Sequence, residues 1–165
     1  MATWTNNDGL KVLFGTTQGQ SEPGGEPVQA GATRKLVVDV DLTQLADANA
    51  AYAQPFTTEL GDGWIINSVT ATVLTAATSG GSAVLDLGVI KAGTAGTDDD
   101  DGFDAAVALT AIDTIGEVVN CDGALVNTEL DADYHFAASY DTAAFTAGLI
   151  RVVIEYTPTE NREDQ

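Results

Sequence analysis

The sequence predicts a mainly β protein, folded as an antiparallel β-sandwich. Apolar and polar residues alternate with a period of two in several runs, which is typical of half-buried strands. Turn signals rich in Gly and Ser lie between these runs, and stretches with helical spacing are scarce. The jelly roll is one form of the sandwich, and the pattern leaves that choice open.

The clearest strand is Lys35–Leu42, in which Val38 and Val40 face one way and Asp39 and Asp41 the other. Comparable alternation recurs at residues 69–73, 83–90, 134–140 and 150–156. The turn signal Ser79-Gly80-Gly81-Ser82 separates the first two of these later runs, so we expect them to pair as a hairpin. Residues 141–148 are expected to form the loop that connects the last two strands.

Two segments have weak helical spacing and are expected to form short helices. The first is Thr43–Ala53, which stops before Pro55, and the second is Phe103–Ile112. Residues 1–34 hold much Gly, Gln, Ser and Glu and little to bury, so an extended N-terminal arm or long loop is expected there. The sandwich domain is then expected over residues 35–157, followed by a polar C-terminal tail over residues 158–165.

The charge is strongly one-sided: 25 Asp and Glu face 6 Lys and Arg, a net charge of −19. Nucleic acid is an unsuitable partner, since phosphate binding needs clustered Lys and Arg. No membrane partner is expected either, because the most apolar stretch, Leu149–Tyr156, is short and carries charge. The first residues lack a basic segment followed by an apolar run, so no secretory signal is expected.

Residues with catalytic or metal-binding chemistry are few, and we expect no catalytic, metal or cofactor site. His135 is the only histidine and lies in an alternating strand, while Cys121, the only cysteine, is expected to be a small buried apolar group. The acidic run Asp98–Asp101 is followed by Gly102, but a calcium loop aligned on that glycine has Ala108 where Glu is required. The run is expected to be a solvated loop tip, with a weak, non-standard cation site as the alternative.

Two N-terminal aromatic residues, Trp4 and Phe14, flank a turn signal in a segment that is otherwise poor in apolar residues. Aromatic residues with few local partners are typical anchors on another protein surface. The alternative, compatible with the first, is that Leu10–Phe14 folds back as an ordinary first strand. The candidate partner-binding residues are therefore Trp4, Asn6, Asn7, Asp8 and Phe14.

Five segments have a familiar sequence, and together they span roughly the first two thirds of the chain: residues 5–16, Gly24-Gly25-Glu26, 38–43, 76–83 and 85–88. In these segments the chain resembles the capsid decoration (cement) proteins of tailed bacteriophages. It implies a β-sandwich on the outer surface of an icosahedral virion, where it would reinforce contacts between major capsid proteins. Major capsid protein and further copies of this chain are the partners that this role implies, with synthesis in the host cytoplasm.

Three other functions remain open at this point. A head fibre, vertex or tail component would differ from a decoration protein in copy number. A carbohydrate-binding sandwich would need aromatic residues exposed on one face, and Tyr134, Phe136 and Tyr140 are the available cluster. An enzyme would have to act through paired carboxylates, for which 25 acidic residues give no specific indication.

Overall fold

A computed structural model describes residues 2–5, 11–14, 33–47, 58–91 and 98–159. The chain divides into two compact units, Met1–Gly31 and Ala32–Gln165. In the first unit, β1 (Ala2–Thr5) and β2 (Lys11–Phe14) pair as an antiparallel ribbon. The expected strand at Leu10–Phe14 is thus present over Lys11–Phe14, whereas the extended arm and the expected domain boundaries stay predictions.

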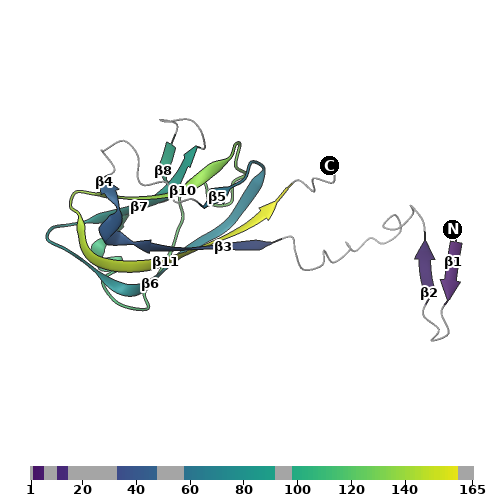
Figure 1. The fold of residues 1–165 in the computed structure, drawn as a ribbon, viewed down its shortest axis with the longest axis horizontal. Coiled ribbons are helices and arrows are strands. Elements are labelled where there is room, and N and C mark those ends of the chain that lie inside the picture. The colour runs from purple at the N-terminus through teal and green to yellow at the C-terminus, as the bar shows by residue number, and fades with distance from the viewer. Residues whose placement is uncertain (1, 6–10, 15–32, 48–57, 92–97, 160–165) are drawn as a thin grey trace. The chain divides into compact units, whose positions relative to one another are not determined.

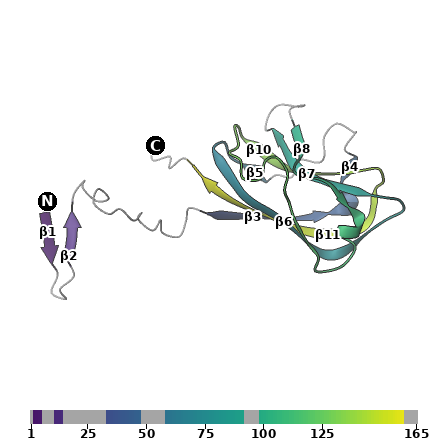
Figure 2. The ribbon, with the colours of Figure 1, turned by 180° about the vertical axis from the view of Figure 1, so that it is seen from behind.

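The second unit is a sandwich of two sheets, which lie above one another in Figures 1 and 2. The β10 sheet has the order β4-β10-β7-β8, and β5 also pairs with β10. Its strands are β4 (Ala46–Asp47), β5 (Glu59–Leu60), β7 (Val84–Lys91), β8 (Asp98–Ala108) and β10 (Tyr134–Asp141). The β11 sheet has the order β3-β11-β6-β9. Its strands are β3 (Arg34–Asp41), β6 (Trp64–Ser79), β9 (Val118–Asn120) and β11 (Phe145–Pro158).

The connections between these strands follow a jelly roll. From β3 the chain crosses to β4 and β5, returns to β6, crosses again to β7 and β8, and then alternates through β9, β10 and β11. Apart from the additional short strand β5 and the parallel β4–β10 pairing, this order of strands in the two sheets is that of a jelly roll. The predicted sandwich is therefore confirmed. All described pairings are antiparallel except the short β4–β10 contact.

Alternation along the strands builds the core between the two sheets. On β3, Val38 and Val40 are buried while Asp39 and Asp41 are exposed, as their spacing predicts. In the other sheet, Phe103 of β8 and Phe136 of β10 stack with ring centroids 6.4 Å apart. Each fully buried side chain of this size contributes roughly 1.5–3 kcal/mol of transfer free energy. The largest buried side chains are Phe103, Phe136, Leu42, Leu60, Ile66, Leu85, Leu87, Ile112, Leu130, Ile150, Ile154 and Val40.

The expected hairpin between residues 69–73 and 83–90 is wrong. Both runs are strands, within β6 and β7, and a turn lies between them, but β6 belongs to the β11 sheet and β7 to the β10 sheet. The ladder partners of β6 are β11 and β9. Alternation reports which face of a strand is buried, and both of these strands bury one face in the same core, so the pattern could not identify the partner.

Neither expected helix is observed in the described residues. Phe103–Ala108 belongs to β8, and Leu109–Ala111 is a 3-10 turn, η2. A bulge in β8, with Ala106 at a φ of 59°, interrupts the period of two. The apolar residues on either side of the bulge therefore have a spacing similar to that of a helix. Of the other segment, Leu42–Gln44 forms a 3-10 turn, η1, and Ala46–Asp47 forms β4. Residues 48–53 lie outside the described part of the chain.

The loop expected over residues 141–148 is shorter in the structure. β10 continues to Asp141 and β11 begins at Phe145, so only Thr142–Ala144 connect them. Ala147 and Gly148 lie inside β11, at shifts in its register with β6. Bulges of this kind place small residues within a strand, which is why these residues looked like loop. In the described residues, no helix is long and apolar enough to cross a membrane.

Candidate interaction surfaces

The β1–β2 ribbon holds two of the predicted partner-binding residues. Trp4 lies in β1 opposite Val12, and Phe14 lies in β2 opposite Ala2. In an antiparallel ladder, directly opposite residues and residues two apart share a face. The register therefore assigns Trp4 and Phe14 to one face of the ribbon and Thr3 and Leu13 to the other. The remaining candidates, Asn6, Asn7 and Asp8, lie outside the described residues.

A two-stranded ribbon of this length has little stability by itself. Isolated hairpins are at best marginally stable in water, and three or more strands or packing on another element are needed for independent stability. Each strand of this ribbon has 4 residues. That Trp4 and Phe14 bind a partner stays a prediction.

The outer face of the β11 sheet is where opposite charges pair. Lys35 Nζ lies 2.6 Å from Glu155 Oε1, and Arg151 donates to both carboxylate oxygens of Asp39, at 2.7 and 2.8 Å. The bidentate hydrogen bonds from Arg151 lower the pKa of Asp39 below its ordinary value. These pairs form because β3 and β11 are in antiparallel register, Asp39 opposite Arg151 and Lys35 opposite Glu155.

Each of the two edge strands of this sheet has an exposed valine. Val37 of β3 is 55% exposed and Val118 of β9 is 54% exposed. Val37 lies opposite Val153, between the two ion pairs. Of the six basic residues in the chain, Arg34, Lys35 and Arg151 are in β3 and β11, so this sheet departs most from the acidic character of the protein.

The acidic run Asp98–Asp101 was expected to be a loop tip, and this expectation is wrong. The run belongs to β8, an edge strand of its sheet. The pairing of β8 with β7 has two register shifts. The acidic run lies at the second of them, between Leu87 and Val89 of β7. There the backbone of β8 passes so close to Gly88 that a side chain at that position would overlap it. Charges and bulges on an edge strand prevent pairing with other chains.

Burial and mutual repulsion act together on the carboxyls of this region. Burial raises the pKa of Asp99, and the neighbouring Asp101 and Asp100 raise it further. Burial also raises the pKa of Asp86, partly offset by the hydrogen bond that its carboxylate accepts from the N–H of Ala106 at 2.8 Å. No group of three or more His, Cys, Asp or Glu side chains could hold a metal ion in the part of the chain that the structure describes.

These raised pKa values predict that mild acidification stabilises the fold. Folded Asp99 holds its proton at a higher pH than the unfolded chain, whose ordinary pKa is 3.8, so the free energy of unfolding falls as the pH rises through the window between the two values. Lowering the pH from 7 toward that window should therefore raise the melting temperature. Asp99→Asn should stabilise the protein at pH 7 by on the order of 0.5 kcal/mol and weaken this pH dependence.

Thermal unfolding followed across pH 4.5–7 tests this expectation. The range begins above the ordinary aspartate pKa of 3.8. Asp62→Asn, at an exposed aspartate in the turn before β6, is the matched control for removing one carboxylate from the protein. Because the lowered pKa of Asp39 acts in the opposite direction, the comparison between variants decides: the same pH dependence in the parent protein and in Asp99→Asn would contradict the assignment.

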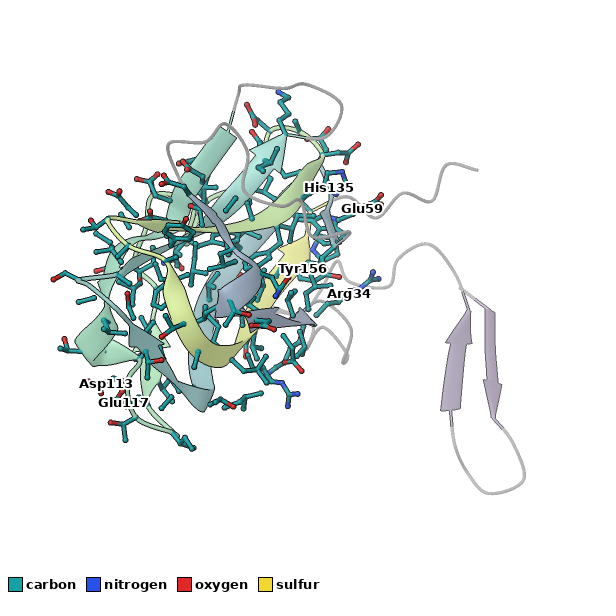
Figure 3. The ribbon with its side chains drawn as sticks, turned by 60° about the vertical axis from the view of Figure 1, so that its left-hand side comes forward. Arg34, Glu59, Asp113, Glu117, His135 and Tyr156 are labelled. Carbon is teal, nitrogen blue, oxygen red and sulfur yellow. The ribbon has the colours of Figure 1, made fainter. Side chains whose placement is uncertain are left out.

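The two residues considered for nucleophilic chemistry lie on different segments of the sandwich. His135 is in β10, opposite Glu59 of β5, and both lie at the end of the sandwich that also holds Arg34 and Tyr156 (Figure 3). Cys121 follows β9 and is buried, as expected. Burial, reinforced by the adjacent Asp104 carboxylate, raises the pKa of the Cys121 thiol to about 12. The thiol is therefore protonated and inaccessible at neutral pH.

The aromatic residues considered for sugar binding point toward the core. Phe136 is fully buried, and Tyr134 and Tyr140 are half-buried and pack against the core cluster. A further aromatic pair could not be expected from the sequence: Trp64 and Tyr156 stack with ring centroids 3.9 Å apart and an interplanar angle of 5°. Trp64 follows the turn Gly61-Asp62-Gly63 and begins β6, a signal for a strand start but not for its stacking partner.

No family model matches the sequence, and no curated protein matches it. Among solved structures, a chain from the Cyanophage Pam1 capsid asymmetric unit superposes with a TM-score of 0.53 at 17% sequence identity, over 87% of this chain and 96% of that chain. A chain from the capsid of Ralstonia phage GP4 gives a TM-score of 0.46 at 19% identity, over 82% and 91%. At such identities the likeness to the Pam1 chain establishes a shared fold.

Proposed function

We propose that this chain is a structural protein of a tailed-phage virion. It binds the outer surface of the capsid and stabilises contacts between major capsid proteins. The observation that carries the proposal is the extent of the structural likeness: 87% of this chain superposes on 96% of a chain from a cyanophage capsid asymmetric unit. The match therefore extends over nearly the whole length of both chains.

The charge supports an outer position. A protein of net charge −19 is repelled by packaged DNA, which carries one negative charge per about 1.7 Å of duplex. The paired Lys35–Glu155 and Asp39–Arg151 contacts show where positive charge is present, and both are already balanced by carboxylates. An inner position would bring unbalanced carboxylates against phosphates, so the exterior is favoured.

The β1–β2 ribbon supplies the proposed anchor. Trp4 and Phe14 share one face by register, and a ribbon of two short strands gains stability when that face packs on a partner. Each copy would bind weakly alone, whereas many copies on a lattice would stabilise it by mass action, because they bind only the assembled form. In this account residues 1–34 form the arm that reaches the capsid, and residues 35–157 form the sandwich that it tethers.

Antibody binding to intact virions of the phage that encodes the chain tests the proposed location and role. We expect an antibody raised against the sandwich to bind intact particles, and quantitative mass spectrometry to find a copy number that is a fixed fraction of the major capsid protein. A few copies per particle would instead indicate a fibre, vertex or tail component. Absence from virions, or antibody binding only after the particles are disrupted, would refute the proposal.

A further inference from the structure

β3 is an edge strand with one open side. In the described part of the chain its only ladder partner is β11, and it forms the end of the order β3-β11-β6-β9. An edge strand presents a row of N–H and C=O groups to a further strand. Its length of 8 residues is enough for a regular ladder, and no bulge or proline interrupts it.

The sequence of β3 is complementary to itself. When two copies of the strand are placed antiparallel and centred on Val37, Lys35 of each copy lies opposite Asp39 of the other. Val37 then lies opposite Val37 on the outer face, and Leu36 opposite Val38 on the core face. Opposite charges and apolar side chains thus meet at each outer-face position from 35 to 39.

We infer that two copies of this protein associate through β3, edge to edge, about a two-fold axis at Val37. A two-fold interface must be complementary to itself, which is the property of this strand. The joined sheets would form one continuous eight-stranded layer in the order β9-β6-β11-β3-β3-β11-β6-β9. The inference concerns the sandwich alone and goes beyond the proposed capsid role.

The side chains at this edge have capacity for a second partner. Lys35 is 63% exposed while paired to Glu155, and Asp39 is 46% exposed while paired to Arg151. An ammonium has three donors and a carboxylate about four acceptor sites, so each group can bridge its own sheet and the other copy. The exposed Val37, 55% accessible between these pairs, would be covered.

Other registers lose this match. Moving one copy by two residues in one direction places Val37 opposite Asp39, and moving it in the other direction places Val37 opposite Lys35. A shift by one residue would set the core face of one copy against the outer face of the other. The shift toward Asp39 still opposes Lys35 to Asp41, so the Val37–Val37 contact together with the Lys35–Asp39 pairs favours the register centred on Val37.

Cysteine cross-linking tests the register. Val37→Cys should give a disulfide-linked dimer under mild oxidation, because the two copies of residue 37 lie opposite each other on the axis. Val118→Cys is the matched control: valine is 54% exposed there, on the other edge strand of the same sheet, and Val118 is not part of the proposed contact. Equal cross-linking of the two variants would overturn the inference.

A charge exchange tests it independently, by sedimentation velocity at about 0.15 M salt, where the screening length is about 8 Å. Lys35→Asp and Asp39→Lys each create two like-charge pairs, so each alone should have a dimer dissociation constant raised about tenfold. Mixing the two variants restores Lys opposite Asp at both positions, so the mixture should dimerise like the parent chain. Circular dichroism confirms that each variant is folded.

Two results would overturn the inference outright. One is a parent protein that stays monomeric over the accessible concentration range at this salt. The other is a mixture of the two charge variants that associates no better than either variant alone. Both measurements use the free protein in solution, so their outcome does not depend on whether the protein binds a capsid.

Discussion

Replacing Gly88 with alanine is expected to lower the free energy of unfolding by about 3 kcal/mol or more, at the upper end of the costs of overpacking. Gly88 is a buried residue of β7, over which the bulged strand β8 passes. A Cβ there would overlap the carbonyl oxygen of Asp99 and lie 2.6 Å from that of Asp100. These are backbone atoms and cannot rotate away, so the β7–β8 ladder must separate locally.

Chemical denaturation of this variant, compared with Gly80→Ala, measures the effect. Gly80 lies in the exposed turn after β6, and a Cβ there would have no atom within 4 Å. Gly80→Ala should therefore change stability by less than about 0.5 kcal/mol. If both variants unfold at the same denaturant concentration as the parent, the close passage of β8 over Gly88 is incorrect.

Removing the two aromatic side chains of the N-terminal ribbon should weaken capsid binding at least about 30-fold, the effect of losing an interface hot spot. Trp4→Ala combined with Phe14→Ala removes both rings from one face of the ribbon. The melting temperature of the sandwich is measured alongside, so that a loss of binding is distinguished from a loss of folding. Binding isotherms to capsids that lack the protein provide the measurement.

The control for this prediction is Thr3→Ala combined with Leu13→Ala, which changes the opposite face of the same ribbon. It alters the same two strands at directly opposed positions, so loss of strand propensity affects both double variants. We expect it to bind within a few-fold of the parent chain. Equal loss of binding in the two double variants would contradict the assignment of capsid binding to Trp4 and Phe14.

The positions of the strands could be predicted from the sequence because burial on one side leaves a period of two. Lys35–Leu42 and residues 150–156 were recognised in this way, and they correspond to β3 and to part of β11. The partners of these strands could not be predicted. β6 pairs with β11, which begins 66 residues after β6 ends, and alternation carries no information about which strand lies beside which.

At the candidate surfaces too, the sequence predicts which residues face outward but not which residues they contact. The alternation of Lys35, Val37 and Asp39 with buried residues identifies an outer face, but the Arg151 and Glu155 partners follow from a register that only the fold determines. The bulge at Ala106 depends on a hydrogen bond to Asp86, 20 residues away. Local sequence could not reveal that contact, and the segment was therefore misread as helical.

Co-sedimentation of the purified protein with mature capsids that lack it tests the central claim most directly. The account predicts saturable binding, at a number of copies fixed by the capsid lattice, and loss of that binding in the Trp4→Ala, Phe14→Ala variant. Binding that never saturates, or no binding at any salt concentration between about 10 mM and 1 M, where the screening length falls from about 30 to 3 Å, would contradict a role on the capsid surface.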